Sequence, residues 1–361
     1  MSAPSTRRGP AEETPEDPGP ARSPVELRLG PDEVTRLLER SYGLRVGAVV
    51  PLGGEAASIY RVSTTRGEWA FKAFAAAPGL LERVRWQSQV QAALHDAGLP
   101  VPGVLADRRG DALTELRSGA GLVLVQVMDW LPGVRLADVP PRPGILRRLG
   151  HSAAALQRAL RDAPRPPQPF THTWDLRRSA EVVRGVRESV LQEDAARLLA
   201  RTLDLLDAEV APLLEHLPTG VVHQDLNDFN VLVDPRHPSG PAVSGIIDFD
   251  DMIVGLRVAE PVIAAVYASR GADDPVQALV TTVGAFHARL PLSDVEIGAV
   301  LPLAAARLAV NTAVWAHRAD GPRGRYARAR SAGSVPVLAR LLEVGSAEVA
   351  ERVLGAAGSG R

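Results

Sequence analysis

Residues 221–251, VVHQDLNDFNVLVDPRHPSGPAVSGIIDFDD, decide how we interpret this chain. Short apolar runs alternate here with two groups of polar side chains that an ordinary core strand would not carry. The pattern predicts a strand and a loop, then a strand pair joined by a Pro- and Gly-rich turn at 234–241, then a second acidic loop. Oxygen-bearing side chains from two such loops suit Mg²⁺ bound to phosphate.

Charge and composition narrow the class of protein. The 361 residues carry a formal net charge of −1 and no cysteine. We therefore expect no binding to nucleic acid or to a membrane surface, no disulfides and no thiolate chemistry. The start of the chain lacks the apolar segment of a signal peptide, and no apolar run approaches the roughly 20 residues that span a bilayer. We expect a cytoplasmic monomer or homodimer.

Lysine is almost absent from the chain. The 41 Lys and Arg residues include one lysine, Lys72, which lies between Phe71 and Phe74 in an expected strand. A lysine buried there requires a charged partner, and a polyphosphate would serve. The turn Gly53–Ser58 is Gly-rich, so its backbone can approach phosphate closely, and we place Ser58 in the same nucleotide site. The competing interpretation of this turn is an ordinary hairpin connection.

A small strand-rich segment precedes a larger helical one. Residues 45–75 predict three strands, residues 79–97 a helix, and Leu122–Met128 a buried strand. This last strand runs into DWLPG at 129–133, which we interpret as a hinge between two lobes. The exposed backbone of Asp129, Trp130 and Leu131 is suited to pair with a flat nucleotide base, although an ordinary strand exit would have the same sequence features.

Beyond the hinge the apolar periodicity is mostly helical. It predicts one long helix at Asp194–Leu217 and another at Asp294–Arg318, kinked at Pro302. We expect an α+β, bilobal fold with a small antiparallel-sheet N-lobe and a larger, mostly helical C-lobe. The predicted boundaries are a disordered tail at 1–24, the N-lobe at 25–132, the C-lobe at 133–347 and a frayed C-terminus at 348–361.

The order of these features suits phosphoryl transfer from a nucleotide. That reaction needs a cation on the phosphates, metal ligands, and a carboxylate that receives the proton of the acceptor hydroxyl. Lys72 supplies the cation, and Asn230 and Asp248 supply oxygen ligands for Mg²⁺. Asp225 is placed to receive the hydroxyl proton. His223 lies in the same loop, and we assign it the supporting task of bonding to backbone near the second acidic loop.

Two motifs in this region carry a family resemblance. HQDLNDFN at 223–230 resembles the HxDxxxxN catalytic loop of kinases, and IIDFDD at 246–251 resembles the metal-binding segment of the aminoglycoside phosphotransferase and choline kinase superfamily. The likeness spans about residues 30–345 and is closest to hydroxylysine kinases and to kinase-like modules fused to some class III aminotransferases.

The resemblance implies a bilobal protein-kinase-like fold, Mg²⁺, and ATP or GTP as the phosphoryl donor. It also implies that Asp225 is the catalytic aspartate, that Asn230 and Asp248 are metal ligands, and that Lys72 contacts phosphate.

Two positions depart from the family's pattern. The helix after the lysine usually offers a Glu to pair with it, whereas QSQV here places Gln87 and Gln89 at that point, with Glu82 further toward the start of the helix. Asp250 stands where the close branch usually has Gly. It would bind a second metal, bind an amine substrate, or weaken nucleotide affinity by repulsion.

We therefore predict a small-molecule kinase acting on a hydroxyl of an amino-containing, hydroxylysine-like metabolite or of an aminoglycoside-type antibiotic. The alternative is a catalytically weak pseudokinase that serves as a nucleotide-binding regulatory module. Carboxylates would hold a substrate ammonium, and the candidates are Asp175, Asp228, Asp250 and Asp251.

Overall fold

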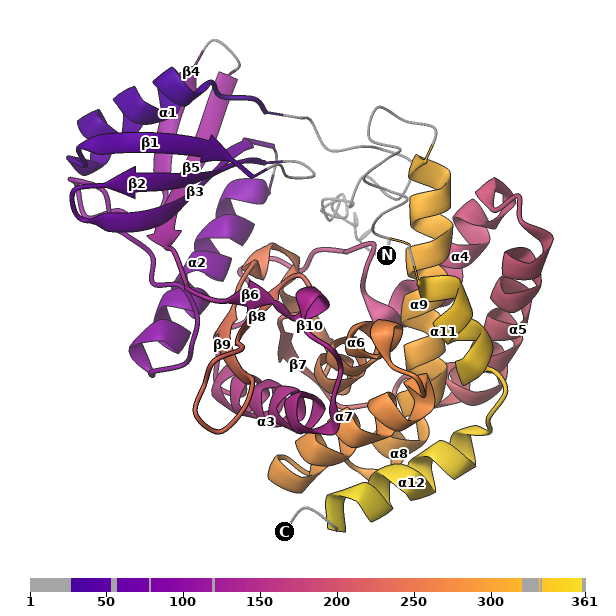
Figure 1. The fold of residues 1–361 in the computed structure, drawn as a ribbon. Helices are drawn as coiled ribbons and strands as arrows, with labels where there is room; N and C mark the ends of the chain where they lie inside the picture. Colours follow the sequence, from indigo (N-terminus) through magenta and orange to yellow (C-terminus); the bar gives the residue numbers. More distant parts are fainter. Residues whose placement is uncertain are drawn as a thin grey trace, which may run out of the picture.

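Two lobes form the molecule, and Figure 1 shows them joined near the end of strand β5. The structure is a computed structural model that describes residues 27–52, 57–77, 79–118, 121–319, 331 and 333–358. The predicted tail at 1–24 and residues 53–56 of the Gly-rich turn lie outside the described residues. The expected α+β, bilobal fold is confirmed, with a small antiparallel sheet in one lobe and mostly helices in the other.

The N-lobe is a five-stranded antiparallel sheet in the order β1-β2-β3-β5-β4. Its strands are β1 (Val46–Pro51), β2 (Ser58–Thr64), β3 (Gly67–Ala75), β4 (Thr114–Ser118) and β5 (Gly121–Asp129). Helix α1 (Pro31–Leu37) continues into a wider helical turn, Leu38–Tyr42, on one face of the sheet. Helix α2 (Leu80–Asp96) covers the other face (Figure 1).

The alternation along β3 explains why Lys72 is buried. Successive side chains of a strand point to opposite faces. Phe71 and Ala73 enter the apolar cluster that α1 shares, while Phe74 packs with Val84 of α2 on the opposite face. Lys72 is therefore on the α2 side. Because helices cover both faces of the sheet, its side chain is only 8% exposed.

The C-lobe packs its helices around one extended apolar core. The helices are α3 (Pro143–Leu160), α4 (Ser179–Val186), α5 (Glu193–Glu209), α6 (Ala259–Ala268), α7 (Pro275–Arg289), α8 (Asp294–Gly298), α9 (Val300–Arg318), α11 (Ser334–Leu341) and α12 (Ser346–Gly358). Two small sheets lie beside them, β6-β8-β9 and β10-β7. Their strands are β6 (Val134–Arg135), β7 (Thr219–Val222), β8 (Val231–Asp234), β9 (Ala242–Ile246) and β10 (Ile253–Leu256).

Prolines explain two differences from the predicted helices. The helix expected at Asp194–Leu217 ends at Glu209, ahead of Pro212, because proline lacks the amide hydrogen that would continue it. The helix expected at Asp294–Arg318 is two helices that separate at Ala299. Pro302 then falls in the first turn of α9, where its missing N–H is not needed, so it causes no kink.

Residues 348–358, within the segment 348–361 for which we predicted a frayed C-terminus, are helical. Helix α12 extends through Gly358, and the last three residues lie outside the described part of the chain. Val349 and Val353 recur at helical spacing and are fully buried, with Ala357 on the same face. The high Ala and Gly content of this segment concealed that face.

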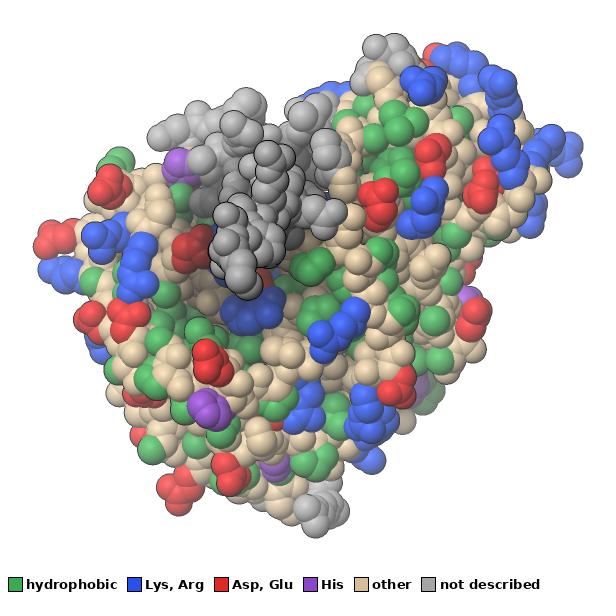
Figure 2. Space-filling model, turned by 180° about the vertical axis from the view of Figure 1, so that it is seen from behind, with side chains coloured by type: hydrophobic (Ala, Val, Ile, Leu, Met, Phe, Trp, Pro, Cys, Tyr) green, Lys and Arg blue, Asp and Glu red, His purple; other side chains and the backbone are tan. Residues whose placement is uncertain are grey.

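The surface shows mixed charge. On the face in Figure 2, acidic and basic side chains are interspersed over the larger lobe. Among the described residues, no helix is both long enough and apolar enough to cross a membrane.

Candidate active site

Two loops of the C-lobe lie side by side below the N-lobe sheet. The first connects β7 to β8 and contains residues 223–230, and the second connects β9 to β10 and contains residues 247–252. Antiparallel pairing of β8 with β9 and of β7 with β10 fixes both ends of each loop. The Ile247 amide also donates to the Asn230 carbonyl at 2.9 Å.

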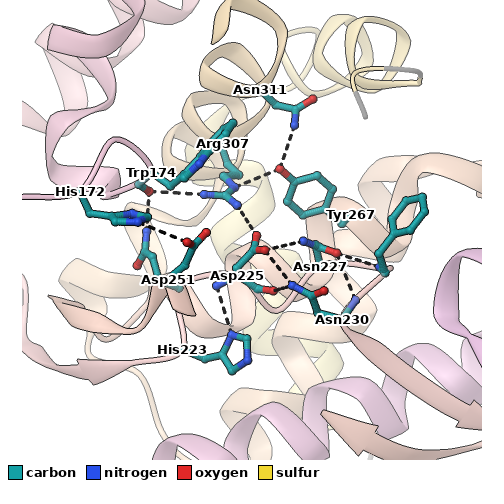
Figure 3. Close-up of polar contacts among 12 residues, drawn as sticks. His172, Trp174, His223, Asp225, Asn227, Asn230, Asp251, Tyr267, Arg307 and Asn311 are labelled. Carbon is teal, nitrogen blue, oxygen red and sulfur yellow. Dashed lines mark hydrogen bonds and ion pairs between the residues drawn. The ribbon is translucent and has the colours of Figure 1, made fainter. Parts of the chain in front are cut away.

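Asp225 is the centre of the first loop's polar contacts (Figure 3). Its Oδ2 accepts from the side-chain amides of Asn227 and Asn230, each at 2.8 Å. The Arg307 guanidinium donates to the other oxygen, Oδ1, at 2.7 Å. The Asp225 side chain nevertheless stays 14% exposed. The predicted base is therefore held in one orientation while remaining open to a ligand.

Arg307 comes from α9, far along the chain from the loop it supports. Its Nε donates to the Tyr267 hydroxyl at 3.1 Å, and the guanidinium carbon lies 4.8 Å from the centre of the Trp174 ring. Asn311, one turn later on α9, donates to the same Tyr267 hydroxyl at 3.2 Å. Figure 3 shows these side chains converging above Asp225.

His223 supports the backbone, as predicted, instead of pointing to an acceptor. It is fully buried; its Nδ1 accepts from the Asp225 amide at 3.3 Å, and its Nε2 lies 3.2 Å from the Ile247 carbonyl oxygen. The imidazole thus ties the two loops together. Glu260 of α6 lies behind it and accepts from the Gln224 amide at 3.1 Å, and burial raises the pKa of this carboxyl.

Backbone strain is concentrated in these two loops. Gln224 (φ 68°) and Asp248 (φ 67°) are the non-glycine residues with positive φ among the described residues. Such a conformation costs of the order of 1–3 kcal/mol and persists where the surrounding structure imposes it, commonly at functional sites. Gln224 is held by its own side chain, whose Nε2 donates to the Trp174 carbonyl at 2.6 Å.

Lys72 crosses from the N-lobe to the second acidic loop. Its Nζ lies 2.7 Å from Asp248 Oδ1 and 2.5 Å from Asp250 Oδ2. Burial acts against the ammonium, but the two carboxylates outweigh it and raise the pKa of Lys72. Burial raises the pKa of the Asp250 carboxyl to about 6, with Lys72 opposing that shift and Asp248 adding to it.

Gln87 occupies the α2 position where a partner for the lysine was expected. Its Nε2 donates to the Asp250 carbonyl at 2.6 Å and to the Met252 carbonyl at 3.3 Å. The carboxylate that reaches Lys72 instead comes from Asp250. The sequence suggests a second metal, an amine substrate or simple repulsion for Asp250, and in the structure this carboxylate pairs with Lys72 of the protein itself.

Asn230 and Asp248 present a donor set that fits Mg²⁺. The Asn230 amide nitrogen is engaged with Asp225, so its oxygen is the atom left for a metal, and the Asp248 side chain is 40% exposed. Across the described chain, no three His, Cys, Asp or Glu side chains gather as a metal site of their own. Mg²⁺ would therefore share its shell with substrate phosphates and water, as it usually does.

The remaining nucleotide candidates are placed less directly. Ser58 is buried, and its hydroxyl donates to the Leu27 carbonyl and accepts from the Leu29 amide, so it anchors the segment before α1. At the hinge, the Asp129 amide donates to Gly103 and the Trp130 amide to Glu68. Two of the three hinge amides thus already bond within the protein, and pairing of the backbone at Asp129, Trp130 and Leu131 with a base stays a prediction.

The four acidic substrate candidates separate into different environments. Asp251 Oδ1 lies 3.2 Å from His172 Nε2, near Asp225 in Figure 3. Burial would raise the pKa of Asp251, but His172, followed by Arg307 and Arg83, holds it well below the usual range. The Asp228 side chain is largely buried, and its carbonyl accepts from the Ala137 amide. Asp175 is also buried and bonds to Arg177 through both oxygens, which argues against its predicted contact with substrate.

Sequence reasoning gave no role to several residues that shape the site: Gln87, His172, Asn227 and Arg307. The available signal for Arg307 was an arginine, followed one turn later by Asn311, in the middle of a long apolar run of α9. A buried charge in such a helix requires a partner.

Comparison with known proteins agrees with this geometry. The phosphotransferase enzyme family (APH) matches residues 48–293. A hydroxylysine kinase of Mus musculus is 27% identical over 307 residues, covering 79% of this chain and 81% of the mouse protein. A hydroxylysine kinase of Danio rerio is 26% identical over 336 residues, covering 90% and 94% of the two chains.

Solved structures share the fold at lower identity. A microcompartment-associated aminopropanol kinase superposes with a TM-score of 0.68 at 18% identity, covering 86% of this chain and 97% of its own. An amicoumacin kinase in complex with AMP-PNP and Ca²⁺ gives a TM-score of 0.61 at 15% identity, covering 89% and 93%. The family match spans more than half of the chain and includes Lys72, Asp225 and Asp248, so the protein belongs to the phosphotransferase enzyme family, whose members transfer phosphate to a hydroxyl group.

Proposed function

We propose that this protein transfers the γ-phosphoryl group of ATP or GTP to a hydroxyl of a small molecule that carries an amine. The observation that carries the proposal is that Lys72 meets Asp248 at 2.7 Å across the two lobes, beside an Asp225 held by Asn230. This arrangement supports the proposal, because phosphoryl transfer requires a cation for the phosphates, metal ligands and a base close together.

Asp225 has the role of receiving the proton of the acceptor hydroxyl. The hydroxyl oxygen then attacks the γ-phosphorus, the bond from that phosphorus to the bridging oxygen breaks, and the nucleoside diphosphate leaves. Asn227, Asn230 and Arg307 hold the Asp225 carboxylate from three sides, so little reorientation is needed when the acceptor binds.

Lys72, Asn230 and Asp248 have the role of holding the phosphates. Mg²⁺, when bound by Asn230 and Asp248, would neutralise charge on the β- and γ-phosphate oxygens. Lys72 adds a fixed positive charge, and its burial between the lobes makes that charge more effective than it would be in water.

Asp251 is the strongest candidate for the acceptor's amine. It lies near Asp225 in Figure 3, its side chain is 28% exposed, and its low pKa keeps it negatively charged. The names of the hydroxylysine kinases and of the aminopropanol kinase specify acceptors that carry both an amine and a hydroxyl. An acceptor of that class would place its ammonium on Asp251 and its hydroxyl on Asp225.

A pseudokinase remains the alternative function. The sequence features that favoured it were the missing glutamate at Gln87 and the extra carboxylate at Asp250. Lys72 nevertheless has two carboxylate partners, which weakens that argument.

A panel of acceptors tests the proposal. Purified protein with Mg²⁺ and ATP or GTP would be incubated with 5-hydroxylysine, aminopropanol, ethanolamine, choline, homoserine and aminoglycosides, and phosphorylated product measured by mass spectrometry. We expect at least one amine-bearing acceptor to be phosphorylated. Asp225→Asn should lower kcat by roughly 10²–10⁴-fold, the usual contribution of a general base, with nucleotide affinity retained.

Asp204→Asn, an exposed position on α5, is the matched control and should keep full activity. Nucleotide binding without transfer to any acceptor would favour the pseudokinase, and an active Asp225→Asn would refute the assigned base.

A further inference from the structure

The ion pair between Lys72 and Asp250 joins two departures from the family pattern. Asp250 Oδ2 is 2.5 Å from Lys72 Nζ, slightly closer than the 2.7 Å from Asp248 Oδ1. The lysine side chain is 8% exposed, so its charge depends on these neighbours. The two departures are therefore neighbours in the structure. Gln87 contacts the Asp250 carbonyl, and the Asp250 side chain contacts Lys72.

Gln87 contacts the backbone of the acidic loop rather than the lysine. It is 4% exposed, and its amide donates to the carbonyls of Asp250 and Met252. A neutral donor suits this place, because a glutamate at 87 would face two carbonyl oxygens and add a third carboxylate beside Asp248 and Asp250. The Gln87 contact thus fixes the backbone from which the Asp250 side chain reaches Lys72.

We propose that Asp250 is a positioning residue that holds Lys72 for the nucleotide phosphates, and that Gln87 holds Asp250. The inference rests on the proposed function, because it assigns the lysine to phosphate. When Asp248 is engaged by metal, Asp250 remains as the counter-charge of Lys72. In the family's pattern a glutamate of the helix pairs with the lysine, whereas here the carboxylate that pairs with Lys72 comes from Asp250 in the acidic loop.

The first test uses the chain's single lysine and needs no nucleotide. Lys72 and the N-terminus are the chain's only primary amines, so acylation of Lys72 can be followed by peptide mass spectrometry without interference. Asp250→Asn should raise the initial rate of Lys72 acylation about tenfold, as expected for losing one charge-assisted contact. Asp204→Asn is the matched control and should react as the wild type does. An unchanged rate in Asp250→Asn would overturn the inference.

The second test measures nucleotide affinity. Asp250→Asn should weaken the Kd for Mg·ATP about tenfold. Gln87→Glu should also weaken it, because a carboxylate at 87 would face the Asp250 and Met252 carbonyls and release the backbone that carries Asp250. Adding Gln87→Glu to Asp250→Asn should cause little further loss, because both changes act on the same contact with Lys72. A double variant that folds like the single variants, as judged by circular dichroism, and loses affinity by the product of the two single effects would contradict the proposed dependence of Asp250 on Gln87.

One further outcome would decide against the inference in a specific way. If excess Mg²⁺ abolishes the binding defect of Asp250→Asn while Lys72 acylation matches wild type, Asp250 is a metal ligand. If Asp250→Asn does not fold, Asp250→Gly gives the same test with no side chain at that position. Wild-type protein that binds no nucleotide would count against the proposed function, whereas the acylation test would still judge the contact between Asp250 and Lys72.

Discussion

Arg307 places a full positive charge inside the C-lobe. Its side chain is 2% exposed, and it lies in a helix whose other buried residues are almost all apolar. Three neighbours make this position tolerable: the Asp225 carboxylate, the Tyr267 hydroxyl and the face of Trp174. The same contacts that stabilise the guanidinium orient the predicted base, so folding and catalysis share one group.

Replacing Arg307 should therefore affect both properties. Arg307→Met leaves the partly buried Asp225 carboxylate without its charged partner, and we expect the free energy of unfolding to fall by about 3–5 kcal/mol. Arg307→Lys should recover part of that stability but not kcat, because an ammonium lacks the planar fork that bonds Asp225 and Tyr267 together. Chemical denaturation and steady-state kinetics measure the two effects.

Arg187→Met, at an exposed position of the same lobe, is the control for losing an arginine. If Arg307→Lys kept full kcat, the orienting role would be wrong.

The sequence could identify chemistry at single residues but not their partners. Lys72, Asp225, Asn230 and Asp248 were predicted from residue type and local motif, and the structure brings them to one place. Arg307 and Asp225 are 82 positions apart, and no local pattern relates them. The contact between Asp175 and substrate stays a prediction, and the sequence does not show that Arg177 already pairs with this carboxylate.

Helices α3 and α7 pack closely against each other in the C-lobe, and Gly150 allows this contact. A Cβ at position 150 would lie 2.2 Å from the Thr282 carbonyl oxygen and 2.9 Å from Ala285 Cβ. Backbone on the facing helix would have to move to admit a methyl group.

Gly150→Ala should therefore destabilise the protein, although alanine normally favours a helix. We expect a loss of about 1–3 kcal/mol from overpacking, seen as a lower midpoint in chemical denaturation. Gly185→Ala on α4 is the matched control, since a Cβ there meets nothing within 4 Å. That variant should gain up to about 1 kcal/mol. A Gly150→Ala protein as stable as Gly185→Ala would show that the two helices can separate freely.

Elements were predictable where their periodicity was strong. The hairpin of β8 and β9 follows from two apolar runs and the turn between them, and the structure forms it with a register shift at Leu232 and Val233. Helix α12 was missed because an alanine-rich sequence is typical both of a buried helix face and of a flexible tail. Its burial depends on the groove that α7 and α9 offer, which is a property of the folded lobe.

Helix α2 packs against the apolar cores of both lobes. Trp86, Val90 and Leu94 lie in the same apolar cluster as the C-lobe helices, while Val84 packs under the N-lobe sheet. The Trp86 indole also donates to the Pro164 carbonyl at 2.6 Å. The chain order separates the lobes at the hinge, but the packing joins them through this helix.

We therefore expect both lobes to unfold in one cooperative transition. Tryptophan fluorescence and far-ultraviolet circular dichroism should give the same midpoint, and Mg·ATP at about 100 times its Kd should stabilise the whole transition by about 2.7 kcal/mol. Two separate midpoints, with the nucleotide shifting only one of them, would show that α2 does not couple the lobes.

The bilobal plan itself was predictable, because strand-like and helical periodicities occupy separate parts of the chain. The way in which α2 joins the lobes was not predictable, because the sequence does not show whether its Trp and Gln side chains face solvent or the other lobe.

The left-handed backbone of Asp248 has a consequence for laboratory evolution. A glycine there would adopt φ 67° without strain, but it would remove the carboxylate that contacts Lys72. Under selection for heat resistance the relieved strain would offset part of the lost ion pair with Lys72, whereas selection for turnover would reject the change outright. Screens for greater thermal stability should keep Asp248 unchanged and mutate other positions.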